Sequence, residues 1–149
     1  WNNVRIKGGA YGCMCGFART GNVYFTSYRD PNLKQTLDIY KDVVQFIEKL
    51  DIDHRDMTKY IIGTISDIDI PRTPSGKGER SLVAYLTNVS FDDIQQERDE
   101  ILATDCQTIR ELAPLLKAVL EQDYICVVGG ESKIKENQDL FNKVEYLFK

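Results

Sequence analysis

Histidine is scarce in this sequence: His54 is the only one among 149 residues. A hydrolytic zinc site takes three protein ligands, drawn mainly from His, Cys and carboxylates. The inverted zinc motif His-x-x-Glu-His needs two histidines, so the sequence excludes it. His54 stands in the run Asp53-His54-Arg55-Asp56, which is typical of a solvated helix start. We therefore expect no metal site within this chain.

Signatures of other enzyme classes are also missing. The sequence contains no Gly-x-Ser-x-Gly elbow, no phosphate-binding P-loop and no dinucleotide-binding fingerprint. Activation of a Ser or Cys nucleophile usually needs a neighbouring base such as histidine. Because the sequence offers one histidine in no such context, a self-sufficient Ser or Cys hydrolase is disfavoured.

Cysteine is sparse as well, with four residues in the chain. Four are too few for a disulfide scaffold, and a chain of this length does not need one, so we expect a reducing, cytoplasmic compartment. Cys13 and Cys15 share one face of a predicted strand, and Cys106 and Cys126 fall in a helix start and an apolar run. We interpret all four as buried structural residues. A metal-binding or redox role for Cys13 and Cys15 is the minor alternative.

Neither charge of one sign nor long apolar runs stand out. The net charge of -4 comes from 19 basic and 23 acidic residues that are well mixed, which argues against a nucleic-acid partner. The longest apolar run, 124–128, is far shorter than the roughly 20 residues that a bilayer-spanning helix needs, so we expect no membrane partner. The chain opens at Trp1 with no Met and no signal-peptide pattern, from which we expect that upstream sequence has been removed.

The length favours one domain over residues 1–149. Small and large residues alternate over 10–18, and aromatic and β-branched residues dominate 23–28, so both segments are predicted strands. The turn-forming residues 20–22 between them predict an antiparallel hairpin.

Helices are expected in the middle of the chain. Asp30-Pro31 predicts a helix start, and an apolar stripe continues over 33–47. Asp53 is predicted to cap a second helix that ends before Pro71. Residues 71–78 are predicted to form an exposed loop, because they are rich in Pro, Gly and Ser.

Shorter elements follow the predicted loop. We expect a short helix over 82–86 and a helix capped by Ser90. A capping box over 104–107 predicts another helix, which Pro114 should kink or break.

The end of the chain is predicted to hold one more strand. The apolar run 124–128 is followed by two glycines and suits a strand that is buried on both faces. Residues 140–147 are expected to form an amphipathic turn. The predicted fold class is therefore α+β, with too few strands for a self-contained sheet.

One constellation near the start could carry chemistry. Arg5 and Tyr11 flank the flexible pair Gly8-Gly9 just before the first predicted strand. Together the cation and the phenol could bind a peptide carbonyl or stabilise a developing oxyanion. On the residues alone an ordinary structural interpretation stays open, in which Arg5 caps a helix C-terminus, the glycines end the helix and Tyr11 packs under the sheet.

The segment 3–12, Asn-Val-Arg-Ile-Lys-Gly-Gly-Ala-Tyr-Gly, resembles the C-terminal half of presequence proteases, members of the pitrilysin and insulin-degrading enzyme superfamily. Segments 27–33, 36–38 and 59–67 resemble the same family in the same order. The resemblance covers the chain to about Val128. It implies part of the layered pitrilysin-type metallohydrolase fold, in which helices pack on one face of an antiparallel sheet.

The resemblance also implies a function. In such metallopeptidases the N-terminal half holds zinc, while the second half contributes an Arg and a Tyr that reach the substrate, here Arg5 and Tyr11 with Gly8 and Gly9 beside them. The chain would thus be the substrate-facing, C-terminal portion of a zinc endopeptidase that degrades unstructured oligopeptides. Its partners would be the zinc-bearing half of the same polypeptide and the peptide, and it would bind no zinc and be inactive alone. The alternative is a non-catalytic peptide-binding or assembly module.

Overall fold

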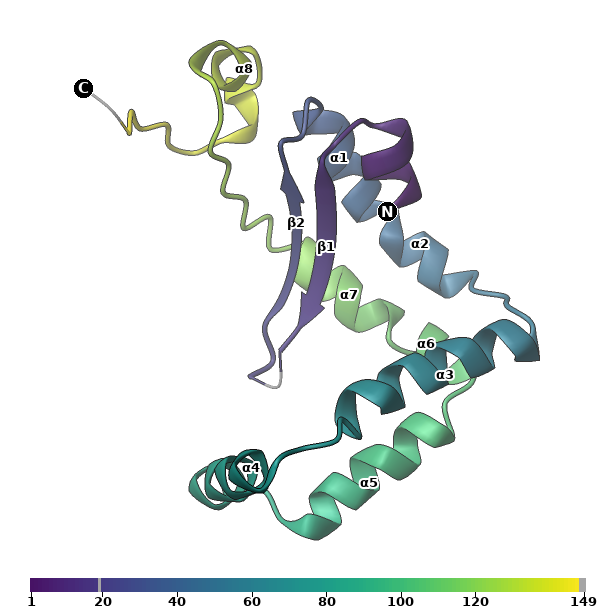
Figure 1. Ribbon diagram of the computed structural model, residues 1–149. Coiled ribbons are helices and arrows are strands. Elements are labelled where there is room, and N and C mark those ends of the chain that lie inside the picture. The colour runs from purple at the N-terminus through teal and green to yellow at the C-terminus, as the bar shows by residue number, and fades with distance from the viewer. Residues whose placement is uncertain (19, 148–149) are drawn as a thin grey trace. The chain divides into compact units, whose positions relative to one another are not determined.

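The computed structural model describes residues 1–18 and 20–147 (Figure 1). Its contacts divide the chain into two compact units, and each is described here by itself. Unit 1 comprises Trp1–Ile47 together with Ala113–Lys149, and unit 2 comprises Glu48–Leu112. That 1–149 acts as a single domain stays a prediction.

A hairpin forms the centre of unit 1, as the sequence predicts. Strand β1, Gly12–Phe17, pairs antiparallel with β2, Val23–Tyr28. The connection is closed by the Ala18 amide, which donates to the carbonyl of Asn22 over 2.9 Å. Gly21 in the turn has φ +86°, a conformation that glycine adopts without steric cost.

A single wide helical turn, η1, precedes the hairpin and spans Asn2–Lys7. It ends at Gly8, which caps its C-terminus: the Gly8 amide donates a hydrogen bond to the carbonyl of Asn3. Val4 on η1 and Ala10 after it are both buried, so this turn is packed into the core of unit 1 rather than fraying. A helical turn that ends at the glycines is what the structural interpretation of this segment expects.

The first predicted helix is split into two and starts later than expected. Helix α1 spans Leu33–Lys41 and α2 spans Val43–Glu48, with a break at Asp42. Asn32, not Asp30, is the N-cap of α1. Asp30 instead accepts hydrogen bonds from the hydroxyl of buried Thr36 at 2.7 Å and from the amide of Asn32 at 2.9 Å. The Asp30 carboxylate therefore holds the loop before α1 against that helix, and it is not the N-cap.

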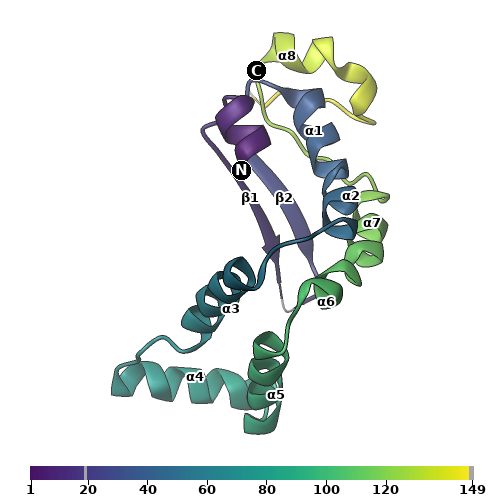
Figure 2. The same ribbon diagram turned by 90° about the vertical axis from the view of Figure 1, so that its right-hand side faces the viewer.

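Helices cover one face of the hairpin. The ring of Tyr40 on α1 lies 5.3 Å from that of Phe25 on β2, measured between centroids. Helix α7, Ala113–Leu120, contacts α1 and buries Ala113 and Leu116. Figure 2 shows α1 and α7 on the same side of the hairpin. The chain therefore has the predicted α+β class, with helices on one face of an antiparallel pair.

Unit 2 is helical, and two of its caps are those that the sequence predicts. Helix α3, His54–Ile68, is capped by Asp53, whose carboxylate accepts from the Asp56 amide at 2.8 Å. Helix α5, Phe91–Leu102, begins with a complete capping box between Ser90 and Asp93. Helices α3 and α5 pack together, with Met57 of α3 buried.

The predicted loop over 71–78 is wrong for most of its length. Helix α4, Pro74–Leu86, begins inside it, with Thr73 as the N-cap and Pro74 at the first helical position. The Thr73 hydroxyl accepts a hydrogen bond from the Gly76 amide at 3.2 Å. Thr-Pro is a strong helix start, because the hydroxyl satisfies a free amide and proline has none to satisfy. These two residues outweigh the low helix propensity of the glycines that follow.

Around residue 105 the predicted helix is present but capped differently. Helix α6, Cys106–Arg110, starts from Asp105, which accepts from the Thr108 amide at 2.8 Å. The hydroxyl of Thr104 instead donates to the carbonyl of Glu100. The expected break near Pro114 is confirmed, since α6 and α7 are separate helices.

The predicted strand over 124–128 is not formed, and Tyr124 is 90% exposed. A strand needs a partner for its amides and carbonyls, and in the described part of the chain no strand pairs with this segment. Helix α8, Glu131–Glu136, and the 3-10 turn η2, Gln138–Leu140, follow. The amphipathic turn expected over 140–147 is wrong, because only Leu140, at the end of η2, lies in a regular element and 141–147 are irregular. Among the described helices, none has the length and apolar character to cross a membrane.

Candidate functional site

Arg5 and Tyr11 are brought together in unit 1. The Nε group of Arg5 on η1 donates to the backbone carbonyl of Tyr11 at 2.9 Å. The Arg5 guanidinium also lies 4.5 Å from the ring centroid of Trp1, within the range of a cation–π contact. Arg5 lies in the last turn of η1, and its side chain donates to the Tyr11 carbonyl, six residues further along the chain.

Gly8 and Gly9, which lie between Arg5 and Tyr11, allow the backbone to pass close to the η1 turn. A Cβ at Gly8 would lie 2.6 Å from the carbonyl oxygen of Val4, closer than real contacts permit. Gly9 has φ +81° and donates its amide to the carbonyl of Arg5 at 3.0 Å. Asn32 at the start of α1 donates its side-chain amide to the carbonyl of Gly8. Because both glycine amides are already bonded, their contribution to the site is its shape.

Tyr11 presents its side chain to solvent rather than to the sheet. Its side chain and backbone together are 67% exposed, so the interpretation that it packs under the sheet is wrong. Its ring meets the ring of Tyr28 edge-on, with centroids 5.9 Å apart and planes at 82°. In the described part of the chain no group is hydrogen-bonded to the Tyr11 hydroxyl. The phenol is thus available as a donor.

Arg29 is a residue of this site that sequence reasoning missed. Its guanidinium carbon lies 5.9 Å from the Tyr11 ring centroid and 5.4 Å from that of Tyr28. Its backbone has φ +48°, which is uncommon for a residue other than glycine. No sequence signal marks this conformation, because arginine is not among the residue types that favour a positive φ.

The cysteines do not form a second site. All four are free; Cys13 and Cys106 are half-buried, whereas Cys15 and Cys126 are exposed. The prediction of burial is therefore wrong for Cys15 and Cys126, the latter because its strand is not formed. Desolvation raises the pKa of the Cys15 thiol above its usual value, which disfavours the reactive thiolate.

No metal centre is present among the side chains that the structure describes. Within 1–18 and 20–147 there is no group of three or more His, Cys, Asp or Glu placed to hold a metal ion. His54 lies exposed in the first turn of α3, where its Nδ1 is 3.5 Å from the hydroxyl of Thr58.

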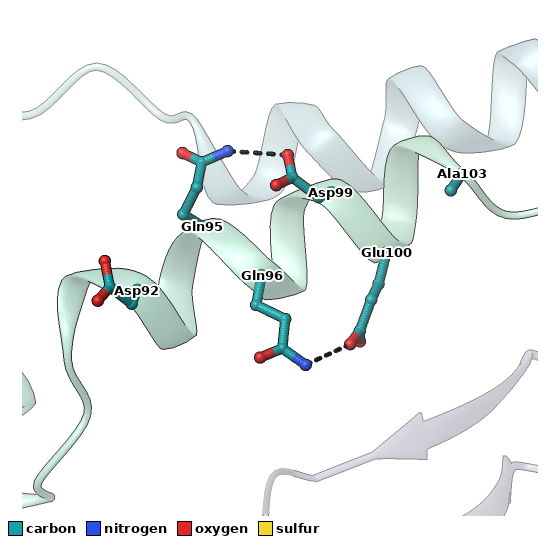
Figure 3. Close-up of a pocket in the computed structure, with 6 residues that line it drawn as sticks. All are labelled: Asp92, Gln95, Gln96, Asp99, Glu100 and Ala103. Carbon is teal, nitrogen blue, oxygen red and sulfur yellow. Dashed lines mark hydrogen bonds between the residues drawn. The ribbon is translucent and has the colours of Figure 1, made fainter.

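An acidic hollow lies along α5 and measures about 480 Å³. Figure 3 shows its polar residues paired along the helix, Gln95 with Asp99 at 2.9 Å and Gln96 with Glu100 at 2.8 Å. The two residues of each pair are four positions apart on a solvated helix surface, and they are hydrogen-bonded to each other. The arrangement stabilises the helix and does not converge on a ligand.

In this α+β chain, the segment that resembles presequence proteases thus places Arg5 and an exposed Tyr11 on either side of a glycine pair. The family model for the PreP C-terminal domain matches residues 1–131. The chain belongs to the PreP C-terminal domain family.

Individual relatives agree with this family. The chain is 47% identical to Protein HypA of Clostridium perfringens over 149 residues, all of this chain and 15% of that protein. It is 39% identical to presequence protease 1, chloroplastic/mitochondrial, of Arabidopsis thaliana over 90% of this chain and 12% of the relative. It is 28% identical to the mitochondrial presequence protease of Danio rerio over 87% of this chain and 12% of that protein. The chain thus spans between 12% and 15% of the length of these relatives.

Proposed function

We propose that this chain is the C-terminal, substrate-facing portion of a zinc-dependent endopeptidase that degrades unstructured oligopeptides. The observation that carries the proposal is the exposed phenol of Tyr11, whose backbone carbonyl accepts a hydrogen bond from Arg5, in a chain of the PreP C-terminal domain family. Zinc and the general base belong, in this proposal, to another part of the same polypeptide. The described residues of this chain do not fit a zinc ion, because their His, Cys and carboxylates do not converge.

Tyr11 acts by donating a hydrogen bond to the peptide carbonyl oxygen as negative charge develops on it. Such donors stabilise a transition state because they are already oriented when the charge appears. Arg5 uses its Nε to hold the Tyr11 backbone, so its two Nη groups remain for a charge-assisted bond to the substrate. Gly8 and Gly9 border the substrate path, where the absence of side chains lets an extended peptide approach.

Exposed apolar surface supports the proposed partner, the zinc-bearing half of the same polypeptide. Large apolar residues are exposed where α4 leads into α5, and Tyr85 and Phe91 are the most exposed of them at 81% and 76%. Aromatic residues such as these are enriched at protein–protein interfaces. The small share of the relatives that the chain spans agrees with further polypeptide lying against it.

From its free cysteines we further propose a cytoplasmic location.

The decisive experiment is Tyr11→Phe in the longer polypeptide that contains this chain. Loss of one such donor lowers kcat by about 10²- to 10³-fold, or roughly 2.7–4 kcal/mol in the transition state. Tyr24→Phe is the matched control, because Tyr24 is also an exposed hairpin tyrosine but lies on β2, outside the site. Turnover unchanged in Tyr11→Phe would remove Tyr11 from the mechanism.

A second experiment tests whether this chain depends on the zinc-bearing half for metal binding and cleavage. We expect the 149-residue chain alone to cleave no peptide and to bind no zinc tightly, since the metal and the base are supplied from elsewhere. Zinc is measured by elemental analysis of the purified chain, and cleavage with an unstructured fluorogenic peptide. One tightly bound zinc per molecule, or cleavage that survives further purification, would contradict the proposal.

The alternative function is a non-catalytic module that binds peptides or assembles with other chains. The hairpin favours it, because a two-stranded sheet leaves the outer edges of β1 and β2 open to an extended peptide within the described part of the chain. The sequence upstream of Trp1 separates the two functions. An intact inverted zinc motif there favours the peptidase, whereas its loss favours the module.

A further inference from the structure

The backbone of Tyr11 is anchored at the point where β2 ends. Its amide donates to the carbonyl of Tyr28 at 3.1 Å and, at 3.4 Å, to the carbonyl of Arg29. The carbonyl of Tyr11 accepts from Arg5 on the other side. These hydrogen bonds fix the backbone of Tyr11, but they leave its exposed side chain free to rotate among its rotamers.

Two contacts restrict that rotation. The ring of Tyr28 meets the Tyr11 ring edge-on, and the guanidinium of Arg29 lies within about 6 Å of both ring centroids, which is the range of cation–π attraction. In the described residues no carboxylate forms an ion pair with Arg29. Its guanidinium is therefore free to stay over the two rings instead of turning toward an anion.

The backbone of Arg29 points to the same role. At φ +48° a glycine would meet the conformational requirement more easily than an arginine. Residues held in this region cluster at functional sites, where the strain is part of the arrangement. At this position the contacts of the guanidinium with the two rings favour Arg over Gly.

We propose that Arg29 is a positioning residue for Tyr11: its guanidinium, seated over the Tyr11 and Tyr28 rings, orders the phenol for hydrogen bonding to the substrate carbonyl. This inference rests on the proposed function of Tyr11. Arg29 does not contact the substrate in this arrangement, and it acts only through the orientation of Tyr11.

The left-handed backbone makes a clean variant available. Arg29→Gly removes the guanidinium and keeps the conformation at low cost, so the fold is retained, which circular dichroism verifies. Asn88→Gly is the matched control, because Asn88 also has a positive φ, 55°, and belongs to unit 2, whereas the residues of the site belong to unit 1. Both are made in the longer polypeptide that contains this chain.

We expect Arg29→Gly to lower kcat about two- to five-fold with KM unchanged, the fold-change of one exposed cation–π contact. In a Tyr11→Phe background the same substitution should have no further effect, because the hydroxyl that it orders is gone. Asn88→Gly should match the wild type. A rise in KM at constant kcat, a loss that persists in the Tyr11→Phe background, or no change at all would overturn the proposal.

A spectroscopic readout distinguishes failure of this proposal from failure of the proposed function. Removal of the guanidinium should shift the NMR resonances of the Tyr11 ring protons in the full chain and leave those of Tyr24 unchanged. If Tyr11→Phe alone leaves turnover intact, the proposed function of Tyr11 fails and a catalytic role of Arg29 fails with it. Unshifted Tyr11 resonances would show that Arg29 does not order the ring, whatever the turnover.

Discussion

Gly8 and Gly9 are adjacent, yet they are required for different physical reasons. At Gly8 the conformation is ordinary, with φ -81°, but the space for a Cβ is filled by the carbonyl of Val4. At Gly9 space is available, with Pro31 at 3.7 Å, but φ is +81°. Neither position accepts a larger residue without a shift of the backbone that carries Arg5 and Tyr11.

Gly8→Ala should therefore destabilise the chain. The new methyl group would press on backbone atoms, which cannot move as a flexible side chain can, and overpacking of this kind costs about 1–3 kcal/mol. Gly12→Ala is the control, because a Cβ there meets nothing within 4 Å. Urea unfolding of both variants measures the difference, and equal midpoints would show that the Val4 carbonyl yields.

At the scale of elements, side-chain caps determine where the helices of unit 2 begin. The Ser90 hydroxyl accepts from the Asp93 amide at 3.1 Å, and the Asp93 carboxylate accepts from the Ser90 amide at 2.7 Å. The two residues thereby satisfy each other's free amides at the start of α5.

Ser90→Ala should lower the free energy of unfolding by about 1 kcal/mol, the usual contribution of an N-cap. Ser81→Ala is the matched control, because Ser81 is an exposed residue within α4 and caps no helix. Thermal unfolding followed by circular dichroism compares the variants. A Ser81→Ala effect as large as that of Ser90→Ala would contradict a capping role.

The capping box also predicts a pH dependence. Hydrogen bonds from the side chain and backbone of Ser90 hold the pKa of the Asp93 carboxyl below its usual value. A lowered pKa in the folded state means that the stabilisation is complete above the unfolded pKa of about 3.9 and is lost as the pH falls through the lowered value. The stability difference between wild type and Asp93→Ala should thus shrink below about pH 4. A difference that stays constant down to pH 2 would show that the carboxylate charge contributes nothing.

At the scale of the whole molecule, the two compact units raise the question of cooperativity. Trp1, the only tryptophan in the sequence, lies in unit 1, whereas helices occur in both units. If 1–149 unfolds as one domain, the tryptophan fluorescence and the helical circular dichroism change at the same denaturant concentration. Transitions at separate midpoints would contradict the single-domain prediction.

Local patterns in the sequence were sufficient for the hairpin, the caps at Asp53 and Ser90, the break near Pro114 and the family. The caps and the break depend on residues within a few positions of one another. The hairpin was readable because a short turn joins its two strands. The identity of Arg5 and Tyr11 as candidates was likewise readable from one short segment.

Only the tertiary structure decided which of the remaining expectations hold. The run 124–128 has the composition of a buried strand, but a strand forms only where another strand supplies the matching hydrogen bonds. The exposure of Tyr11 and the placement of Arg29 over its ring depend on β2 returning beside β1, a pairing of residues far apart in the sequence. Local composition specifies which bonds a segment can make, whereas the chain's long-range path decides which partners are present to make them.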